Sequence, residues 1–298
     1  NYPNGSVLNT FQVSRYIKRM SQAAMQTCVS GETAADQVTL VWFKRDLRIS
    51  DHPALQRAAS GAGQVLPVYI IEPDYWRLPD MSGRHWDFIA DCLSDLQTDL
   101  TRLGAPLALR EGDAVEVLEM LRQQFGFTHM TSHIETGNLW SFARDQKVAD
   151  WARAQGVVWT ELPQSAVTRG IARANRWADR RGRFVAEPLL PLSPALRGVK
   201  LVPGALPCAA ALGLSASRPG TLQAGGRRQA ERVLDDFLQR RGQPYRRAMS
   251  SPLSAETACS RLSPYISYGN ISIREVYKAL LNSWDKPGWR RSMKALSS

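Results

Sequence analysis

Two short segments of this sequence carry residue types suited to binding chemistry. The first is a charged run that directly follows six apolar or β-branched residues, Val38 to Phe43. Its charged side chains are Lys44, Arg45, Asp46, Arg48 and Asp51. The second segment, Cys259 to Ser263, contains two serines and a single charge. Small hydroxyl residues at a helix start let backbone N–H groups approach a phosphate closely. The second segment therefore predicts a phosphate-binding turn, although a serine-rich helix cap has the same residue types.

The charged run needs a strand to deliver it and a helix to leave from it. Six residues, Val38 to Phe43, are too few for a helix and fit a strand that is buried on both faces. Ser50 or Asp51 can cap the following helix, and Pro53 fits its first turn, where a missing N–H costs nothing. The charged run then lies at the carboxyl edge of an open parallel sheet, which is where ligands bind.

Strand-like and helical patterns alternate from Val38 to Leu162. The predicted strands are 38–43, 64–71, 106–109, 128–133 and 157–162. Apolar residues recur with helical spacing over 82–103, 113–125 and 139–155. This alternation predicts an α/β fold with a five-stranded parallel Rossmann-like sheet, right-handed crossovers and helices on both faces. No G-x-G-x-x-G follows the first strand, which excludes a standard NAD or FAD Rossmann site.

Composition shifts divide the chain into four parts. Residues 1–36 form an N-terminal extension that we expect to be disordered, and residues 37–163 form the sheet domain. Residues 164–218, rich in arginine and proline, are typical of an interdomain linker. Residues 219–298 begin an all-helical domain. Two alternatives for the extension stay open: residues 1–19 are upstream sequence rather than protein, or the leader is an organelle transit peptide.

Net charge and composition limit the binding partners and the cellular location that we expect. The 298 residues carry a formal net charge of +11, which favours polyanionic partners, although a basic protein that is merely soluble has the same charge. No uncharged apolar run reaches the roughly 18 residues that a membrane span needs, so we expect a soluble protein with no membrane partner. The four cysteines are far apart and show no C-x-x-C spacing, which supports neither a zinc site nor a disulfide framework. A reducing, cytoplasmic location is the simplest expectation.

The two segments together resemble the photolyase/cryptochrome family. Trp42 to Arg48, followed by Asp51-His52-Pro53-Ala54-Leu55, is similar to the opening signature of that family. In the family, a Gly-Gly helix precedes a tyrosine that contacts the flavin's phosphate region, and a Thr-Ser-x-Leu-Ser segment holds the pyrophosphate. Here the matching residues are Tyr245, Ser260, Arg261, Leu262 and Ser263. Cys259 stands where threonine is usual, which removes one hydroxyl donor.

The resemblance implies a light-dependent flavoprotein. Its cofactor would be FAD, and the parent protein would be a deoxyribodipyrimidine photolyase, in which reduced FAD donates an electron that splits pyrimidine dimers. This reaction needs no general acid, nucleophile or metal, and we assign no catalytic residue. Two alternatives stay open: a cryptochrome-type blue-light photoreceptor without repair activity, and a generic nucleotide-binding α/β module. The resemblance covers about residues 38–298 but only part of a family member, so we expect the chain alone to bind little FAD and to repair nothing.

The resemblance also implies an antenna chromophore and a DNA surface. A folate or a deazaflavin would bind in the sheet domain with Glu135 and Asn138 as candidate contacts, although a helix-capping turn explains the same residues. The expected partner is double-stranded DNA containing pyrimidine dimers, bound by a monomer. The candidate DNA-binding residues are Arg246, Arg247, Arg180 and Arg181. Trp177 lies among the linker arginines, and we expect it to pack in the core rather than to stack on a base.

Overall fold

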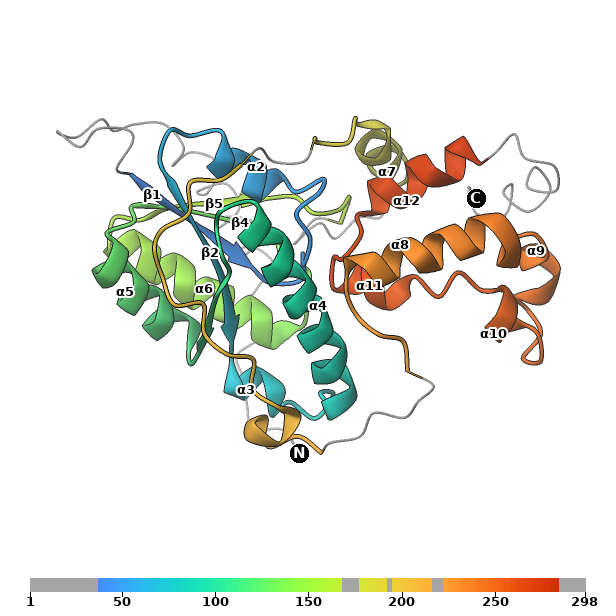
Figure 1. Ribbon diagram of the computed structural model, residues 1–298, viewed down its shortest axis with the longest axis horizontal. Coiled ribbons are helices and arrows are strands. Elements are labelled where there is room, and N and C mark those ends of the chain that lie inside the picture. Colours follow the sequence, from blue (N-terminus) through green and yellow to red (C-terminus); the bar gives the residue numbers. More distant parts are fainter. Residues whose placement is uncertain (1–36, 168–176, 192–194, 216–221, 284–298) are drawn as a thin grey trace.

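The computed structural model describes residues 37–167, 177–191, 195–215 and 222–283 (Figure 1). It is built around a sheet of five strands: β1 (Val38–Phe43), β2 (Gln64–Ile71), β3 (Ala108–Glu111), β4 (His129–His133) and β5 (Val158–Leu162). The strand order is β3-β2-β1-β4-β5, and every neighbouring pair is parallel. The predicted five-stranded parallel sheet is therefore confirmed. Because the strand order reverses between β1 and β4, their carboxyl ends form the switch point at which open sheets bind ligands.

One strand, β3, is shifted by two residues from its predicted range, while β4 and β5 each begin one residue later than predicted. The expected strand was 106–109, whereas β3 covers Ala108–Glu111 and pairs with β2 from Val68 onward. Pro106 has no backbone N–H to donate to a ladder, which explains why pairing starts beyond it.

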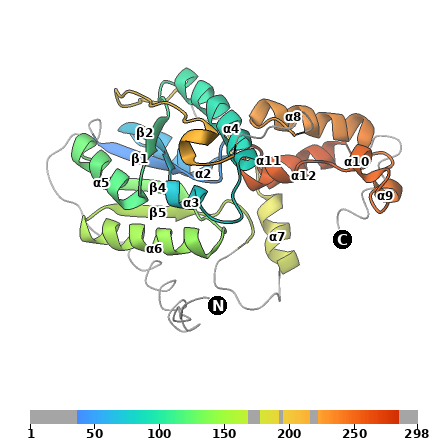
Figure 2. The ribbon, with the colours of Figure 1, turned by 90° about the horizontal axis from the view of Figure 1, so that it is seen from below.

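Helices cover both faces of the sheet (Figure 2). The two core clusters place α2 (Pro53–Ala59) and α4 (Gly83–Arg102) on one face, and α5 (Ala114–Phe125) and α6 (Leu139–Ala154) on the other. The short α3 (Pro73–Trp76) precedes α4. The three long helices agree with the predicted ranges to within one residue at each end, because their buried residues recur every three or four positions.

The rest of the described chain is helical. It comprises α7 (Trp177–Ala186), η1 (Ala209–Leu212), α8 (Arg227–Asp236), η2 (Phe237–Arg241), α9 (Tyr245–Ala248), α10 (Ala255–Ala258), α11 (Ser263–Ser267) and α12 (Ile273–Asn282). α8 passes directly into η2, a turn of π-helix, and α12 begins at a capping box formed by Ser272 and Glu275. Among the described residues, no helix has both the length and the apolar character needed to cross a bilayer.

A close backbone approach joins α8 to α4. A Cβ at position 225 would lie 2.1 Å from the carbonyl oxygen of Phe88 and 2.7 Å from Cys92 Sγ, so only glycine fits there. One apolar cluster then runs from the sheet through Leu93 of α4 to Leu234 of α8 and Tyr265 of α11. The helical part is thus packed against the face of the sheet domain that carries α4 (Figure 1).

Candidate functional site

The charged loop after β1 reaches the switch point, but its charges hold the helical part of the chain. Asp51 is 1% exposed, and its carboxylate accepts hydrogen bonds from Ser272 Oγ at 2.5 Å and from Arg274 Nη2 at 2.6 Å. The backbone N–H of Leu190 donates to the same carboxylate at 3.1 Å. Buried charges persist only when they are paired and hydrogen-bonded. Asp51 is therefore an anchor for α12.

Arg48 forms the second part of this joint. It is 2% exposed, and its guanidinium donates to the carbonyl oxygens of Asp51 and Gly269 at 3.0 Å each. Next to it, the backbone N–H of Leu47 donates to the carbonyl oxygen of Tyr268 at 3.0 Å. The signature loop therefore serves as a docking surface for a segment more than two hundred residues later.

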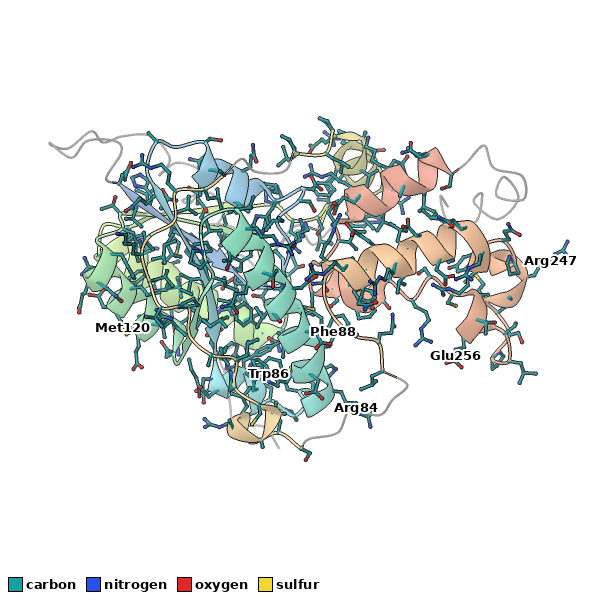
Figure 3. All side chains as sticks on the ribbon, in the orientation of Figure 1. Arg84, Trp86, Phe88, Met120, Arg247 and Glu256 are labelled. Carbon is teal, nitrogen blue, oxygen red and sulfur yellow. The ribbon has the colours of Figure 1, made fainter. Side chains whose placement is uncertain are left out.

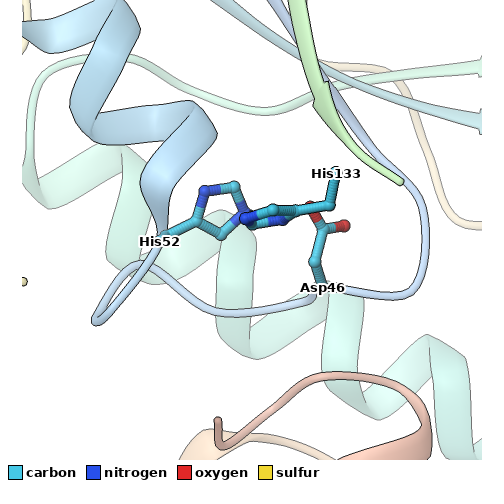
Figure 4. Close-up of side chains that lie close together, drawn as sticks. All are labelled: Asp46, His52 and His133. Atoms are coloured by element: carbon cyan, nitrogen blue, oxygen red, sulfur yellow. The ribbon is translucent and has the colours of Figure 1, made fainter. Parts of the chain in front are cut away.

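Asp46, His52 and His133 form a buried cluster at the switch point (Figure 4). Asp46 Oδ2 accepts a hydrogen bond from His133 Nδ1 at 2.6 Å and from His52 Nε2 at 3.0 Å. His52 Nδ1 accepts the backbone N–H of Leu55 at 3.0 Å and so caps α2. Because an acceptor nitrogen carries no proton, the hydrogen of His52 is on Nε2.

The electrostatics of the cluster keep both imidazoles neutral. Burial would raise the pKa of Asp46, but the hydrogen bonds from His133 and His52 lower it well below its usual value. Burial, followed by the charge of His52, lowers the pKa of His133 to about 3. The three groups offer metal-ligand atoms within 4.8 Å of one another. The charge of the buried Arg48 also lowers the pKa of both histidines, which disfavours a cation, and hydrogen bonds account for the arrangement without a metal.

A small cavity lies at the carboxyl ends of β1 and β2. Its volume is about 30 Å³, which is room for about one water molecule. Rings such as Trp42, Tyr69 and Tyr75 line it, together with the charged groups of Glu72 and Arg144. An aromatic wall with a few polar groups is typical of a site for a planar ligand, but the observed volume admits none.

Arg144 contacts several of the residues that line this cavity. Its guanidinium donates to Glu72 at 2.7 Å and to Glu135 at 2.6 Å, and lies 4.9 Å from the centre of the Trp42 ring. Burial raises the pKa of Glu72 to about 7 against the opposing charge of Arg144. The antenna candidate Glu135 thus lies in the cavity wall. The other candidate, Asn138, is exposed and accepts the backbone N–H of Ser141 as the N-cap of α6.

The backbone carbonyl groups of the second loop, 259–263, accept hydrogen bonds from side chains outside the loop. Arg241, the last residue of the π-turn η2, donates to the carbonyl oxygen of Cys259 and to that of Ser260. Gln223 Nε2 donates to the carbonyl oxygen of Arg261 at 3.0 Å. In a trans peptide, the C=O and the following N–H point in opposite directions. Each of these peptides therefore turns its N–H away from the side chain that holds its carbonyl.

The backbone of this loop has a conformation that suits an anion. Arg261 has φ +56°, in the left-handed region, and Leu262 follows with φ −86° and ψ −12°. Successive left- and right-handed residues form a nest, a backbone concavity whose N–H groups bind anions. Ser263 is exposed and begins α11, while Tyr245 begins α9 and packs edge-on against Phe237 at 5.7 Å. Between them, α10 packs against α9 and η2.

The candidate DNA-binding arginines lie in two places. Arg180 and Arg181 are on α7, which packs against α12. Arg247 is on α9, at the far end of α8 from the sheet (Figure 3). The side chain of Arg246 lies outside the described residues. Trp177, at the start of α7, is 41% exposed, so the predicted packing of this ring in the core is wrong.

Sequence reasoning did not find His133, Arg144, Arg241 or Arg274. His133 ends β4 beside the signature loop, and a histidine at the carboxyl end of a predicted strand was the available signal. The three arginines lie on helices, where an arginine usually indicates a solvated face. Only the folded chain brings their acceptors within reach.

The sheet domain and the helical part both have relatives among known proteins. The family model of DNA photolyase matches residues 39–197, slightly more than half of the chain. The chloroplastic/mitochondrial cryptochrome DASH of Arabidopsis thaliana is 32% identical over 126 residues, which cover 40% of this chain and 22% of that protein. The deoxyribodipyrimidine photo-lyase of Halobacterium salinarum is 27% identical over 263 residues, 80% of this chain and 54% of the relative.

A solved structure shares the fold over nearly all of the chain. The bacterial class III photolyase of Agrobacterium tumefaciens superposes with a TM-score of 0.73 and 22% identity, covering 91% of this chain and 58% of that one. Because the superposition extends past residue 197, it includes helices beyond the matched family model. The matched regions thus cover 22%, 54% and 58% of the lengths of these three proteins, which is less than two thirds of each.

Proposed function

The chain belongs to the DNA photolyase family, and on that premise we propose that it forms the sheet domain and first flavin-binding helices of a light-dependent DNA repair protein. The proposed parts are the sheet domain over 37–163, the linker over 164–218 and the N-terminal part of a helical FAD-binding domain over 219–298. The proposed activity of the parent protein is that of a deoxyribodipyrimidine photolyase, acting as a cytoplasmic monomer on double-stranded DNA that contains pyrimidine dimers.

The observation that carries this proposal is the loop 259–263. Its carbonyl oxygens are held by Arg241 and Gln223, and Arg261 and Leu262 form a nest. Backbone donors fixed in this way suit a diphosphate, and the N–H of Leu262 would exchange its long hydrogen bond to Ser260 Oγ, 3.4 Å, for one to the anion.

FAD fits the donor set of this part of the chain. The hydroxyls of Ser260 and Ser263 and the nest N–H groups would hold the diphosphate, and Tyr245 would contact the same region. Bound and reduced, FAD supplies the electron that light drives into the dimer. The chain's own residues would bind and orient the cofactor. Because Cys259 stands where the family has threonine, the loop 259–263 has one hydroxyl donor fewer than the family pattern.

DNA would be positioned by electrostatic contacts. We assign Arg180, Arg181, Arg246 and Arg247 to phosphate contacts, which fix the orientation of a duplex without reading its sequence. The net charge of +11 supports this assignment. Binding should weaken as salt rises, and an affinity that salt leaves unchanged would rule out phosphate contacts.

An antenna chromophore remains part of the proposal. Glu135 lines the aromatic cavity at the carboxyl ends of β1 and β2, next to the switch point, where a folate or a deazaflavin would enter. Because the cavity holds about one water molecule, a chromophore can enter only if rings of its wall, such as Tyr75, move outward. Asn138, on the outside as a helix cap, would contact only a part of the ligand that protrudes.

The second candidate function is a blue-light photoreceptor without repair activity. The 32% identity to a cryptochrome DASH favours it over classes outside the family. The two functions share the flavin and differ in what the excited flavin acts on.

Repair of a defined substrate separates the two. The full-length parent protein is purified with its flavin, reduced, and mixed with duplex DNA that carries one pyrimidine dimer. We expect loss of the dimer under blue light and none in the dark. Flavin-loaded, fully reduced protein that leaves the dimer intact supports the photoreceptor instead, and a full-length protein without any flavin overturns both.

A further inference from the structure

Helix α7 presents a tryptophan and three arginines on ten residues. Trp177 is 41% exposed, and Arg181 and Arg183 are exposed on the same helix. Trp177 and Arg181 are four residues apart, so they are neighbours on one face of the helix. Asp179 is the one acidic residue of α7. A basic helix with an open aromatic ring thus remains on the outside of the molecule.

The helix is held firmly at its other end. Val185 is 6% exposed, and the guanidinium of Arg274 lies 5.0 Å from the centre of the Phe184 ring. Arg274 also donates to Glu187 at 2.9 Å and to the buried Asp51 at 2.6 Å. α7 is therefore fixed through α12 to the sheet domain at its C-terminal end, while Trp177 and Arg181 at its N-terminal end are exposed.

The two arginines of this half differ in exposure, with Arg181 exposed and Arg180 half-buried. Arg180 Nε is buried and has no hydrogen-bond partner among the residues that the structure describes. Arg181 makes no ion pair within the described ranges. The buried Nε of Arg180 is out of reach of a ligand, so Arg180 would contact one only through the rest of its half-exposed side chain. A phosphate oxygen is a strong acceptor for such arginine N–H groups.

We propose that the N-terminal half of α7 binds unpaired DNA, with Trp177 stacking on a base and Arg180 and Arg181 contacting the adjacent phosphates. The faces of paired bases are hidden inside the duplex stack, whereas an unpaired base offers a face to an indole. The surface therefore prefers single-stranded or locally opened DNA over an intact duplex. This inference rests on the proposed DNA binding but not on the flavin chemistry.

The test compares two DNA probes. A fluorescein-labelled oligothymidine and an undamaged duplex are titrated by anisotropy with this chain and with the full-length parent. We expect tighter binding of the single strand, with an about tenfold loss for Trp177→Ala, since stacking on one base is worth that much. Trp177→Phe should recover part of the loss because it restores a ring. For Arg181→Gln, we expect the slope of log affinity against log salt to fall by about 0.7.

Matched controls separate stacking from general effects. Leu139→Ala removes an apolar side chain of α6 that is 86% exposed, and Arg153→Gln removes an exposed arginine from the same helix. Both should leave single-strand affinity unchanged, and melting temperatures should show that all variants fold. The proposal is overturned if Trp177→Ala binds the oligothymidine as well as the unaltered protein, or if its only effect is on self-association measured by sedimentation. Either result leaves the photolyase proposal intact, because that proposal is decided by dimer repair.

Discussion

The charged loop after β1 and the loop 259–263 are the two candidate binding segments, and they differ in where their polar groups point. The loop after β1 is dense in charge, yet Asp46, Arg48 and Asp51 are each 1–2% exposed and are bonded within the protein. The loop 259–263 carries a single charge. Its backbone carbonyls accept hydrogen bonds from Arg241 and Gln223, and its backbone forms a nest of N–H groups. Charge density in a sequence therefore does not identify a ligand site. A buried charge must find its partner inside the fold, and a group paired in this way is not free for a ligand.

The largest effect that this comparison predicts is at Asp51. Asp51→Asn leaves the buried guanidinium of Arg274 without its main counter-charge, and we expect a loss of about 4 kcal/mol in the free energy of unfolding. Urea denaturation measures it. The control is Asp74→Asn, which breaks an exposed pair with Arg77 and should change stability by less than about 0.5 kcal/mol. Equal effects of the two variants would mean that the joint does not anchor α12.

The histidine cluster predicts acid sensitivity. The folded-state pKa of His133 is about 3, against an ordinary value of about 6.5 in the unfolded chain. Between these values the unfolded chain binds a proton that the folded chain does not. The stability contributed by the neutral His133 is therefore fully present above about pH 6.5. It falls by about 1.4 kcal/mol for each pH unit below that, until the folded pKa is reached.

His133→Asn should flatten this dependence by about one proton. Unfolding curves between neutral pH and pH 4 test the prediction, with His85→Gln, which removes an exposed imidazole, as the control. Parallel curves for His133→Asn and the unaltered chain would contradict a neutral, buried imidazole.

Local sequence patterns predicted the strands and helices of the sheet domain better than the contacts of the candidate site. The strands and the helices α4, α5 and α6 were predictable because their apolar periodicity is a property of neighbouring residues. The pairing of Asp51 with Arg274 joins positions 223 residues apart, and no local pattern records it. The displaced start of β3 and the open ring of Trp177 have the same origin, because pairing and burial are decided by neighbours in space.

Substitutions that affect the loop 259–263 should change FAD affinity, whereas those in the charged loop after β1 should change stability. Arg241→Gln releases the carbonyls of Cys259 and Ser260, so in the full-length parent we expect an about tenfold loss of FAD affinity. Arg240→Gln is the matched control, since Arg240 lies on the same turn, contacts Asp236 and is open to solvent. Equal loss of FAD affinity in both variants would show that general charge, rather than the held carbonyls, matters.

A smaller gain is expected at the position that departs from the family pattern. Cys259→Thr restores a hydroxyl beside the nest, and one added hydrogen bond should tighten FAD binding by about threefold to tenfold. Flavin fluorescence titration measures the change. Weaker binding in this variant would mean that the thiol side of residue 259 does not face the cofactor.

The central claim is that the loop 259–263 holds the diphosphate of FAD, while the charged loop after β1 holds the fold. The most direct measurement is the affinity of the full-length parent for FAD and for riboflavin, which lacks the diphosphate, in the unaltered protein and in the variant with Ser260→Ala and Ser263→Ala together. We predict that the variant loses about tenfold in affinity for FAD and nothing for riboflavin. Equal changes for both ligands, or no change for either, would contradict the claim.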